Sequence, residues 1–211
     1  MSEVKKHNDP GSRGNLTIIT RSYMDVIKDY YYNNKFTDFK QDRLVATCEI
    51  HGRVVTFYLN FVKLPGPFAY KIGAFYYPNV QNYKNRISIT MALYDHFTEK
   101  YLFDVYARVR GCVVHEIEHH LQKVKFPFRE SLAKKDFEDN EAYINDPSEI
   151  EAYAKQLYSL HRQSKESFYK LLIEEAESVA HNEKEHDLFI SNIISFLVRR
   201  SDLNLFKNIK F

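Results

Sequence analysis

Residues 113–121 read VVHEIEHHL and contain two histidines, His115 and His119, with Glu116 directly after the first of them. In an α-helix, positions four apart lie about 40° from each other around the axis, so both imidazoles project from one face. The apolar residues of the same segment form a stripe and are Val113, Val114, Ile117 and Leu121. This pattern predicts a half-buried helix that presents two metal-ligating side chains together.

Two imidazoles on one helix face are suited to bind zinc, because the neutral ring offers a nitrogen lone pair to the metal. A catalytic zinc has three protein ligands and keeps one position open for water. Glu116 has the position of a carboxylate that accepts a proton from that water. We therefore expect His115 and His119 to bind zinc, and a polar surface helix without a metal is the alternative interpretation.

The third ligand distinguishes the classes of zinc peptidase. A metzincin has glycine and histidine at the positions that Gln122 and Lys125 occupy in this chain, so the sequence excludes that class. Further along the chain, residues 146–153 read DPSEIEAY and begin a second predicted helix. This helix contains two candidate oxygen ligands, Glu149 and Glu151.

The segments HEIEHH (115–120) and PSEIEAYA (147–154) together resemble the gluzincin arrangement, in which HExxH is followed by a glutamate in an ExxA context. The likeness is greatest to the small intracellular gluzincins related to the ImmA and IrrE peptidases, which phages commonly encode. It covers about residues 110–155. The resemblance implies a Zn²⁺ cofactor, and the zinc ligands and catalytic carboxylate that it implies are His115, His119, Glu149 and Glu116.

Glu149 also has a purely structural interpretation. Asp146 is suited to be a helix N-cap and Pro147 to be the first helical residue, which places Glu149 where a capping-box glutamate stands. The small side chain of Ala152 favours metal ligation, because it allows this helix to approach the HExxH helix closely. Glu151 remains the alternative third ligand.

Other polar residues near the two segments have weaker functional interpretations. His120 lies about 100° around the helix from His119, so we expect it to pack away from the metal, and we expect Glu118 to be solvated. An oxyanion stabiliser is usually required, and the candidates by location are Tyr153, Tyr158 and His161. The resembling families usually have Asn or Asp four residues after the ligand glutamate, where this chain has Tyr153.

The remaining sequence predicts an α+β fold, with one helix, then an antiparallel sheet, then several helices. The predicted strands are 44–50, 53–63, 68–77 and 87–94, with a hairpin turn at His51 and Gly52. The predicted helices are 22–32, 99–124, 147–163, 165–180 and 185–199, with a loop at 125–145. We expect a strand around 87–91 to form a sheet edge that binds substrate by adding its backbone as a further strand.

The predicted architecture is a zincin-like, minimal gluzincin domain with a twisted sheet above the active-site helix. We expect a flexible tail at 1–14, the metallopeptidase domain at 15–163, and a helical extension at 164–211 that packs on the same domain.

Composition supports a soluble globular protein, with 44% hydrophobic and 27% charged residues. The formal net charge of +2 gives no field that favours nucleic acid or an anionic membrane. Cys48 and Cys112 match neither a disulfide framework nor a Cys-x-x-Cys metal site. No apolar run follows the basic N-terminal residues, and none approaches the roughly 18 residues of a membrane span. We therefore expect a cytoplasmic protein, in the host cytoplasm if a phage encodes it.

The predicted function is that of a zinc metallopeptidase, a hydrolase in which Glu116 assists the attack of a zinc-bound water on a protein or peptide substrate. The alternative is a catalytically inactive zincin-fold protein, such as a phage-encoded one, that acts as a binding module. A third possibility is a helical interaction protein in which HEIEHH occurs by chance.

Overall fold

The computed structural model describes residues 13–33, 43–63, 66, 68–78, 85–94, 96–127 and 139–200. The chain divides into two compact units, an N-terminal unit of residues 1–124 and a C-terminal unit of residues 125–211. The predicted domain at 15–163 and the predicted helical extension at 164–211 stay predictions. Most of the predicted tail at 1–14 lies outside the described residues.

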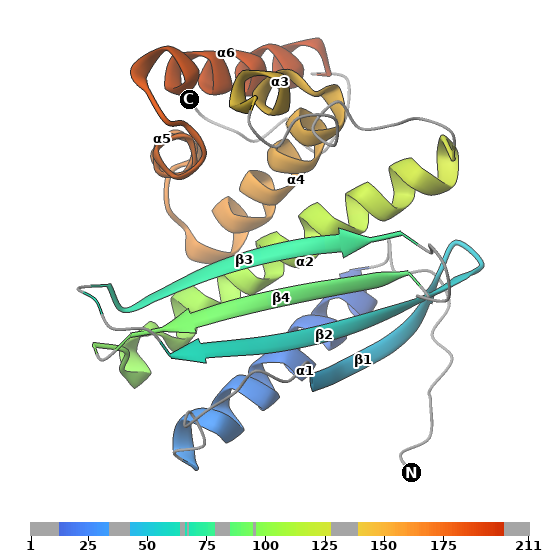
Figure 1. Ribbon diagram of the computed structural model, residues 1–211, viewed down its shortest axis with the longest axis vertical. Helices are drawn as coiled ribbons and strands as arrows, with labels where there is room; N and C mark the ends of the chain where they lie inside the picture. The colour runs from blue at the N-terminus through green and yellow to red at the C-terminus, as the bar shows by residue number, and fades with distance from the viewer. Residues whose placement is uncertain are drawn as a thin grey trace. The chain divides into compact units, whose positions relative to one another are not determined.

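The N-terminal unit contains a four-stranded mixed sheet with the strand order β1-β2-β4-β3 (Figure 1). The strands are β1 (Arg43–Ile50), β2 (Arg53–Lys63), β3 (Tyr70–Tyr77) and β4 (Arg86–Leu93), which confirms all four predicted strands. His51 and Gly52 join β1 to β2 with φ angles of 47° and 74°. Positive φ at both central residues is typical of the type I′ turn that suits a two-residue hairpin.

The sheet differs from the antiparallel prediction at its centre, where β2 and β4 are parallel. β4 lies between β2 and β3, and its residues Ile87, Ile89 and Met91 are fully buried. A strand with a neighbour on each side has no free row of backbone amides for a peptide. The expectation that residues 87–91 form a substrate-binding edge is therefore wrong, and the edges among the described strands are β1 and β3.

Two helices cover the same face of this sheet, α1 (Arg13–Tyr32) and α2 (Leu102–Lys125), and a short 3₁₀ helix, η1 (Glu99–Tyr101), precedes α2 (Figure 1). α1 extends the predicted 22–32 helix toward the N-terminus. The reason is that the apolar spacing continues upstream, with Ile19 buried in the same core and Leu16 packed against it.

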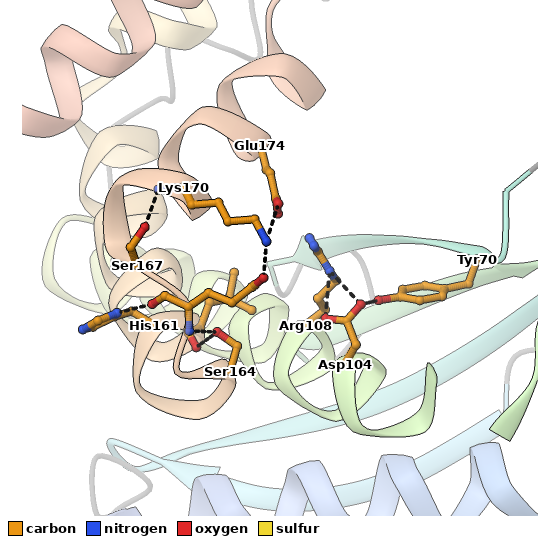
Figure 2. A network of polar contacts seen from close by, with 10 residues as sticks. Tyr70, Asp104, Arg108, His161, Ser164, Ser167, Lys170 and Glu174 are labelled. Atoms are coloured by element: carbon orange, nitrogen blue, oxygen red, sulfur yellow. Dashed lines mark hydrogen bonds and ion pairs between the residues drawn. The ribbon is translucent and has the colours of Figure 1, made fainter. Parts of the chain in front are cut away.

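The start of α2 is tied to the edge strand of the sheet. The Tyr70 hydroxyl donates a hydrogen bond to Asp104, and Asp104 also forms an ion pair of 3.4 Å with Arg108 one turn further along α2 (Figure 2). The sheet-facing stripe of α2 consists of Val105, Val109, Val113 and Ile117. This stripe fixes which face of α2 is directed away from the sheet.

The C-terminal unit consists, in its described part, of the helices α3 (Asn140–Asn145), α4 (Pro147–Ser164), α5 (Phe168–Val179) and α6 (Glu183–Arg199). α4, α5 and α6 confirm the three predicted helices. The prediction of a loop throughout 125–145 is wrong at its end, because α3 forms there. Asp139 caps α3 by accepting from the Ala142 amide at 3.0 Å, and Ile144 is buried, so this short helix is held at both ends.

In the described part of the chain, no helix combines the length and the apolar character that crossing a membrane requires.

Tyr23 connects α1 to the sheet and gives the fold a dependence on alkaline pH. Its side chain is fully buried, and its hydroxyl donates to the Tyr58 carbonyl oxygen at 3.1 Å. Burial is the main cause that raises the pKa of Tyr23 well above its ordinary value near 10, and Cys112 and Glu116 raise it further. The folded state therefore favours the neutral phenol more strongly than the unfolded state does.

We expect the free energy of unfolding to fall as the pH rises above about 10. A folded pKa above the unfolded one gives stability that is complete below the unfolded pKa and is lost as the pH rises through the folded pKa. One such tyrosine contributes a slope of up to about 1.4 kcal/mol per pH unit. Urea unfolding at several pH values between about 8 and 11 measures this slope.

Tyr23→Phe should flatten the alkaline slope, whereas the control Tyr77→Phe should leave it unchanged, because Tyr77 is 47% exposed. If Tyr23→Phe keeps the wild-type slope, burial of the Tyr23 phenol does not cause the alkaline loss.

Candidate metal centre

His115 and His119 form the centre of the candidate site, and both lie on α2. His115 follows Val113 by two residues, and His119 follows Ile117 by two residues. Two residues correspond to about 200° around the helix, so both histidines project away from the sheet that Val113 and Ile117 face. The two Nε2 atoms are 3.0 Å apart, and the ring centroids are 4.7 Å apart with the rings nearly perpendicular. The helix spacing therefore brings the two nitrogens to one point, as predicted.

Gln122 fixes the protonation of the second histidine. Its carbonyl oxygen lies 3.2 Å from His119 Nδ1, and a carbonyl oxygen can only accept, so Nδ1 donates the hydrogen. A neutral ring protonated at Nδ1 has its lone pair on Nε2, the atom that faces His115. Gln122 thus acts as the outer partner that metal-ligating histidines usually have. This role was not predicted from the sequence, although the i, i+3 spacing of Gln122 from His119 is a signal for it.

Glu116 and Glu118 are both buried, with 5% and 7% of their surface exposed. The prediction that Glu118 is solvated is therefore wrong. Helical periodicity places these two carboxylates on different sides of α2. Burial of a charged carboxylate is costly unless a cation, a metal or hydrogen bonds compensate for it. The concentration of buried acids around the histidine pair is therefore typical of a charged functional site rather than of a solvated surface helix.

His120 packs against the sheet, which confirms that it points away from the histidine pair. Its side chain is fully buried, with Nδ1 at 3.1 Å from the Tyr76 hydroxyl and Nε2 at 3.5 Å from the Ile50 carbonyl oxygen. Burial is the main cause that lowers the pKa of His120, so the neutral ring is favoured. His120 therefore anchors α2 to β1 and β3.

Glu149 lies in the first turn of α4 and is 8% exposed. Asp146 caps this helix by accepting from the Ser148 amide at 2.8 Å, as predicted. In a capping box, the Asp146 amide would donate to the glutamate, but here this amide donates to the Tyr143 carbonyl oxygen at 3.1 Å. Capping therefore does not account for the position of the Glu149 carboxylate.

The Tyr143 hydroxyl of α3 lies 2.9 Å from the Tyr153 hydroxyl within the C-terminal unit. Burial is the main cause that raises the pKa of Tyr143 well above the ordinary value, with further contributions from Tyr153 and Glu149. The sequence did not predict this contact, since Tyr143 lies in a segment predicted to be a loop.

His115 and His119 belong to the N-terminal unit and Glu149 to the C-terminal unit, and each of the three offers one atom that could bind a metal ion. Two nitrogens bound to a tetrahedral zinc at about 2.0–2.1 Å are about 3.3 Å apart, close to the 3.0 Å between the two Nε2 atoms. Two imidazole nitrogens and one carboxylate oxygen are also the donor set of a catalytic zinc site with one position left open. The donors therefore fit zinc.

Glu151 has other partners. Its carboxylate forms ion pairs with Lys155 at 3.1 Å and with Arg200 at 3.5 Å.

Two of the three candidate oxyanion stabilisers are far from Glu149 along α4. Tyr158 lies about 13 Å and His161 about 18 Å beyond Glu149 at 1.5 Å rise per residue. His161 Nδ1 instead donates to the Glu166 carbonyl oxygen at 2.6 Å and holds the turn from α4 to α5 (Figure 2). Tyr153 is one turn from Glu149, but its hydroxyl is hydrogen-bonded to Tyr143. These contacts do not test the oxyanion role, so Tyr153, Tyr158 and His161 stay candidates for it.

Comparison of the chain with family models, with curated proteins and with solved structures gave no match in any of the three.

Proposed function

We propose that this chain is a zinc-dependent metallopeptidase of the gluzincin type with a zincin-like fold. The observation that carries this proposal is the pair of His115 and His119, whose Nε2 atoms lie 3.0 Å apart, with Glu116 buried beside the first histidine. Glu149 is the proposed third ligand. The resemblance of HEIEHH and PSEIEAYA to the gluzincin segments supports the same assignment. The proposed substrate is a peptide bond of a protein or peptide.

When bound, zinc supplies a Lewis acid that polarises the scissile carbonyl and lowers the pKa of a water toward neutrality. Glu116 accepts a proton from this water, whose oxygen forms the new bond to the carbonyl carbon. Glu116 then donates the proton to the amine nitrogen as the peptide C–N bond breaks. Gln122 keeps the Nε2 lone pair of His119 available by accepting from Nδ1.

The test uses the full chain, purified after expression with added zinc. We expect about one zinc per chain by elemental analysis, and cleavage of a denatured protein such as casein. A chelator should abolish cleavage, and added zinc should restore it. Absence of zinc would contradict the metal site. Bound zinc without cleavage of casein or of a peptide library would instead support the inactive zincin-fold binding module.

A further inference from the structure

The sheet of the N-terminal unit has a second face, opposite the face that α1 and α2 cover (Figure 1). Residues alternate along β3, so Ile72 and Ala74 pack against the core while Phe75 and Tyr77 point to this second face. Phe75 and Tyr77 are 57% and 47% exposed. A methyl group added to Gly73, on the same face, would meet no heavy atom within 4 Å beyond its chain neighbours. The open face, formed by the outward side chains of β2, β3 and β4, therefore presents two aromatic rings to solvent.

Arg86 of β4 lies among the aromatic rings of the open face. Its guanidinium carbon is 4.2 Å from the centroid of the Tyr58 ring and 5.7 Å from the centroid of the Tyr77 ring. Both distances are within the range of cation–π contacts. Tyr58 belongs to β2 and Tyr77 to β3, the two strands that flank β4, so the guanidinium is held from both sides. A charged group is thus fixed on this face before any ligand binds.

The charge of the open face is positive. The strands β2, β3 and β4 contain no aspartate and no glutamate, whereas Lys71 and Arg86 belong to the face. The one acid in the four described strands is Glu49 of β1, at the opposite edge of the sheet from β3. The formal net charge of +2 is a sum over the whole chain and does not report this local distribution. The open face is therefore suited to an anionic ligand.

Between its aromatic rings the open face carries hydrogen-bonding groups. The Asn60 amide donates to the Ser88 hydroxyl at 3.3 Å, and Arg86 donates to the same hydroxyl at 3.5 Å. The buried centre of a protein–protein interface is more apolar than this arrangement. Nucleobases, in contrast, offer both a flat ring for stacking and polar edges for amide and hydroxyl groups. Among anionic ligands, these groups favour a nucleic acid over an acidic protein.

We propose that the open face of the sheet binds single-stranded nucleic acid. Bases stack on Phe75 and Tyr77, and phosphates pair with Lys71 and Arg86. Proteins that bind single strands combine aromatic side chains, on which successive bases stack, with a positively charged surface that follows the phosphate backbone. An exposed sheet face with aromatic residues is one known form of such a platform. None of the proposed zinc ligands lies on the sheet, so this activity does not depend on the proposed peptidase site.

The test measures the binding of fluorescein-labelled oligothymidine and oligouridine of about 15 nucleotides to the full chain by fluorescence anisotropy. We expect both single strands to bind at low salt and more tightly than a duplex of the same length, because paired bases cannot stack on the rings. Added salt should weaken the binding, since phosphate contacts release counterions. The ratio of the two dissociation constants shows whether DNA or RNA is the preferred source of the strand.

Substitutions on β3 separate stacking from charge. Phe75→Leu and Tyr77→Leu keep an apolar side chain but remove the ring, and each should raise the dissociation constant about 5- to 100-fold. Lys71→Ala should reduce the slope of log affinity against log salt by about 0.7. The matched control is Phe103→Leu, because Phe103 is 65% exposed but lies on α2. This control should bind the oligonucleotides like the wild type.

Absence of binding at low salt overturns the proposal, and so does equal binding of the duplex. Wild-type affinity in both Phe75→Leu and Tyr77→Leu also overturns it. Sedimentation velocity tests a protein as the occupant, since dimers that Phe75→Leu dissociates, without oligonucleotide binding, would assign the open face to a second copy of the chain. Thermal unfolding checks that the variants fold. If a leucine variant has a lower midpoint, the salt slope of Lys71→Ala decides, and an unchanged slope overturns the proposal.

Discussion

Glu116→Gln is expected to lower peptidase activity by about 10²- to 10⁴-fold while the zinc content stays at the wild-type level. Glutamine keeps the shape of the buried side chain but cannot accept a proton from water. Glu116 is 5% exposed, so solvent does not readily replace it as a base. Initial rates of casein cleavage and elemental analysis of the same samples give the two measurements.

The matched control for this prediction is Glu118→Gln, the same substitution two residues further along α2. Glu118 is buried to a similar degree, at 7% exposure, but lies about 200° around the helix from Glu116. The peptidase activity of Glu118→Gln should stay within a few-fold of that of the wild type. An equal loss of activity in both variants would show that activity depends on a buried carboxylate in general and not on proton transfer by Glu116. Loss of zinc in Glu116→Gln would assign Glu116 to metal binding.

The second large effect is the loss of bound zinc that we expect when any one of the three proposed ligands is replaced. His115→Ala, His119→Ala and Glu149→Ala should each reduce zinc from about one per chain to a small fraction of that, because two donors bind the ion far more weakly than three. A metal that binds only the folded state at about a thousand times its dissociation constant stabilises that state by about 4 kcal/mol. Removal of zinc from the wild type should therefore lower the melting temperature by about 8–16 °C.

Chelator-induced shifts in melting temperature, measured by calorimetry, should be absent from the three ligand variants. The control is Glu151→Ala, which removes the ion pairs with Lys155 and Arg200 but should keep both the zinc and the chelator shift. This control also tests the remaining alternative for the third ligand. Zinc loss in Glu151→Ala together with zinc retention in Glu149→Ala would reverse the assignment of these two glutamates.

The parts of the fold that the sequence predicted well are those that depend on local periodicity. The His115–His119 spacing predicted a shared helix face, and the structure places their Nε2 atoms 3.0 Å apart. Helical periodicity also predicted that His120 points away from this pair, and His120 packs against Tyr76 and Ile50. The strand segments were also local, since β-branched and aromatic residues bounded by turn residues form strands in many contexts.

The features that were missed depend on contacts between distant segments. The parallel pairing of β2 with β4 is a choice of neighbour that no single strand reveals. Glu118 is polar and looked solvated, but its burial depends on what packs around α2. Tyr143 belongs to α3, a helix of six residues that is too short to show a clear periodicity. The fold class could therefore be predicted, whereas these contacts between distant segments could not.

The position of β4 between β2 and β3 also determines the order in which the sheet can assemble. The β1–β2 and β3–β4 pairs each join antiparallel strands that follow one another in the sequence, so both pairs can close early. The parallel pairing of β2 with β4 joins the two pairs and is the non-local step. Until it forms, one side of β2 and one side of β4 expose unpaired amides that can recruit another polypeptide.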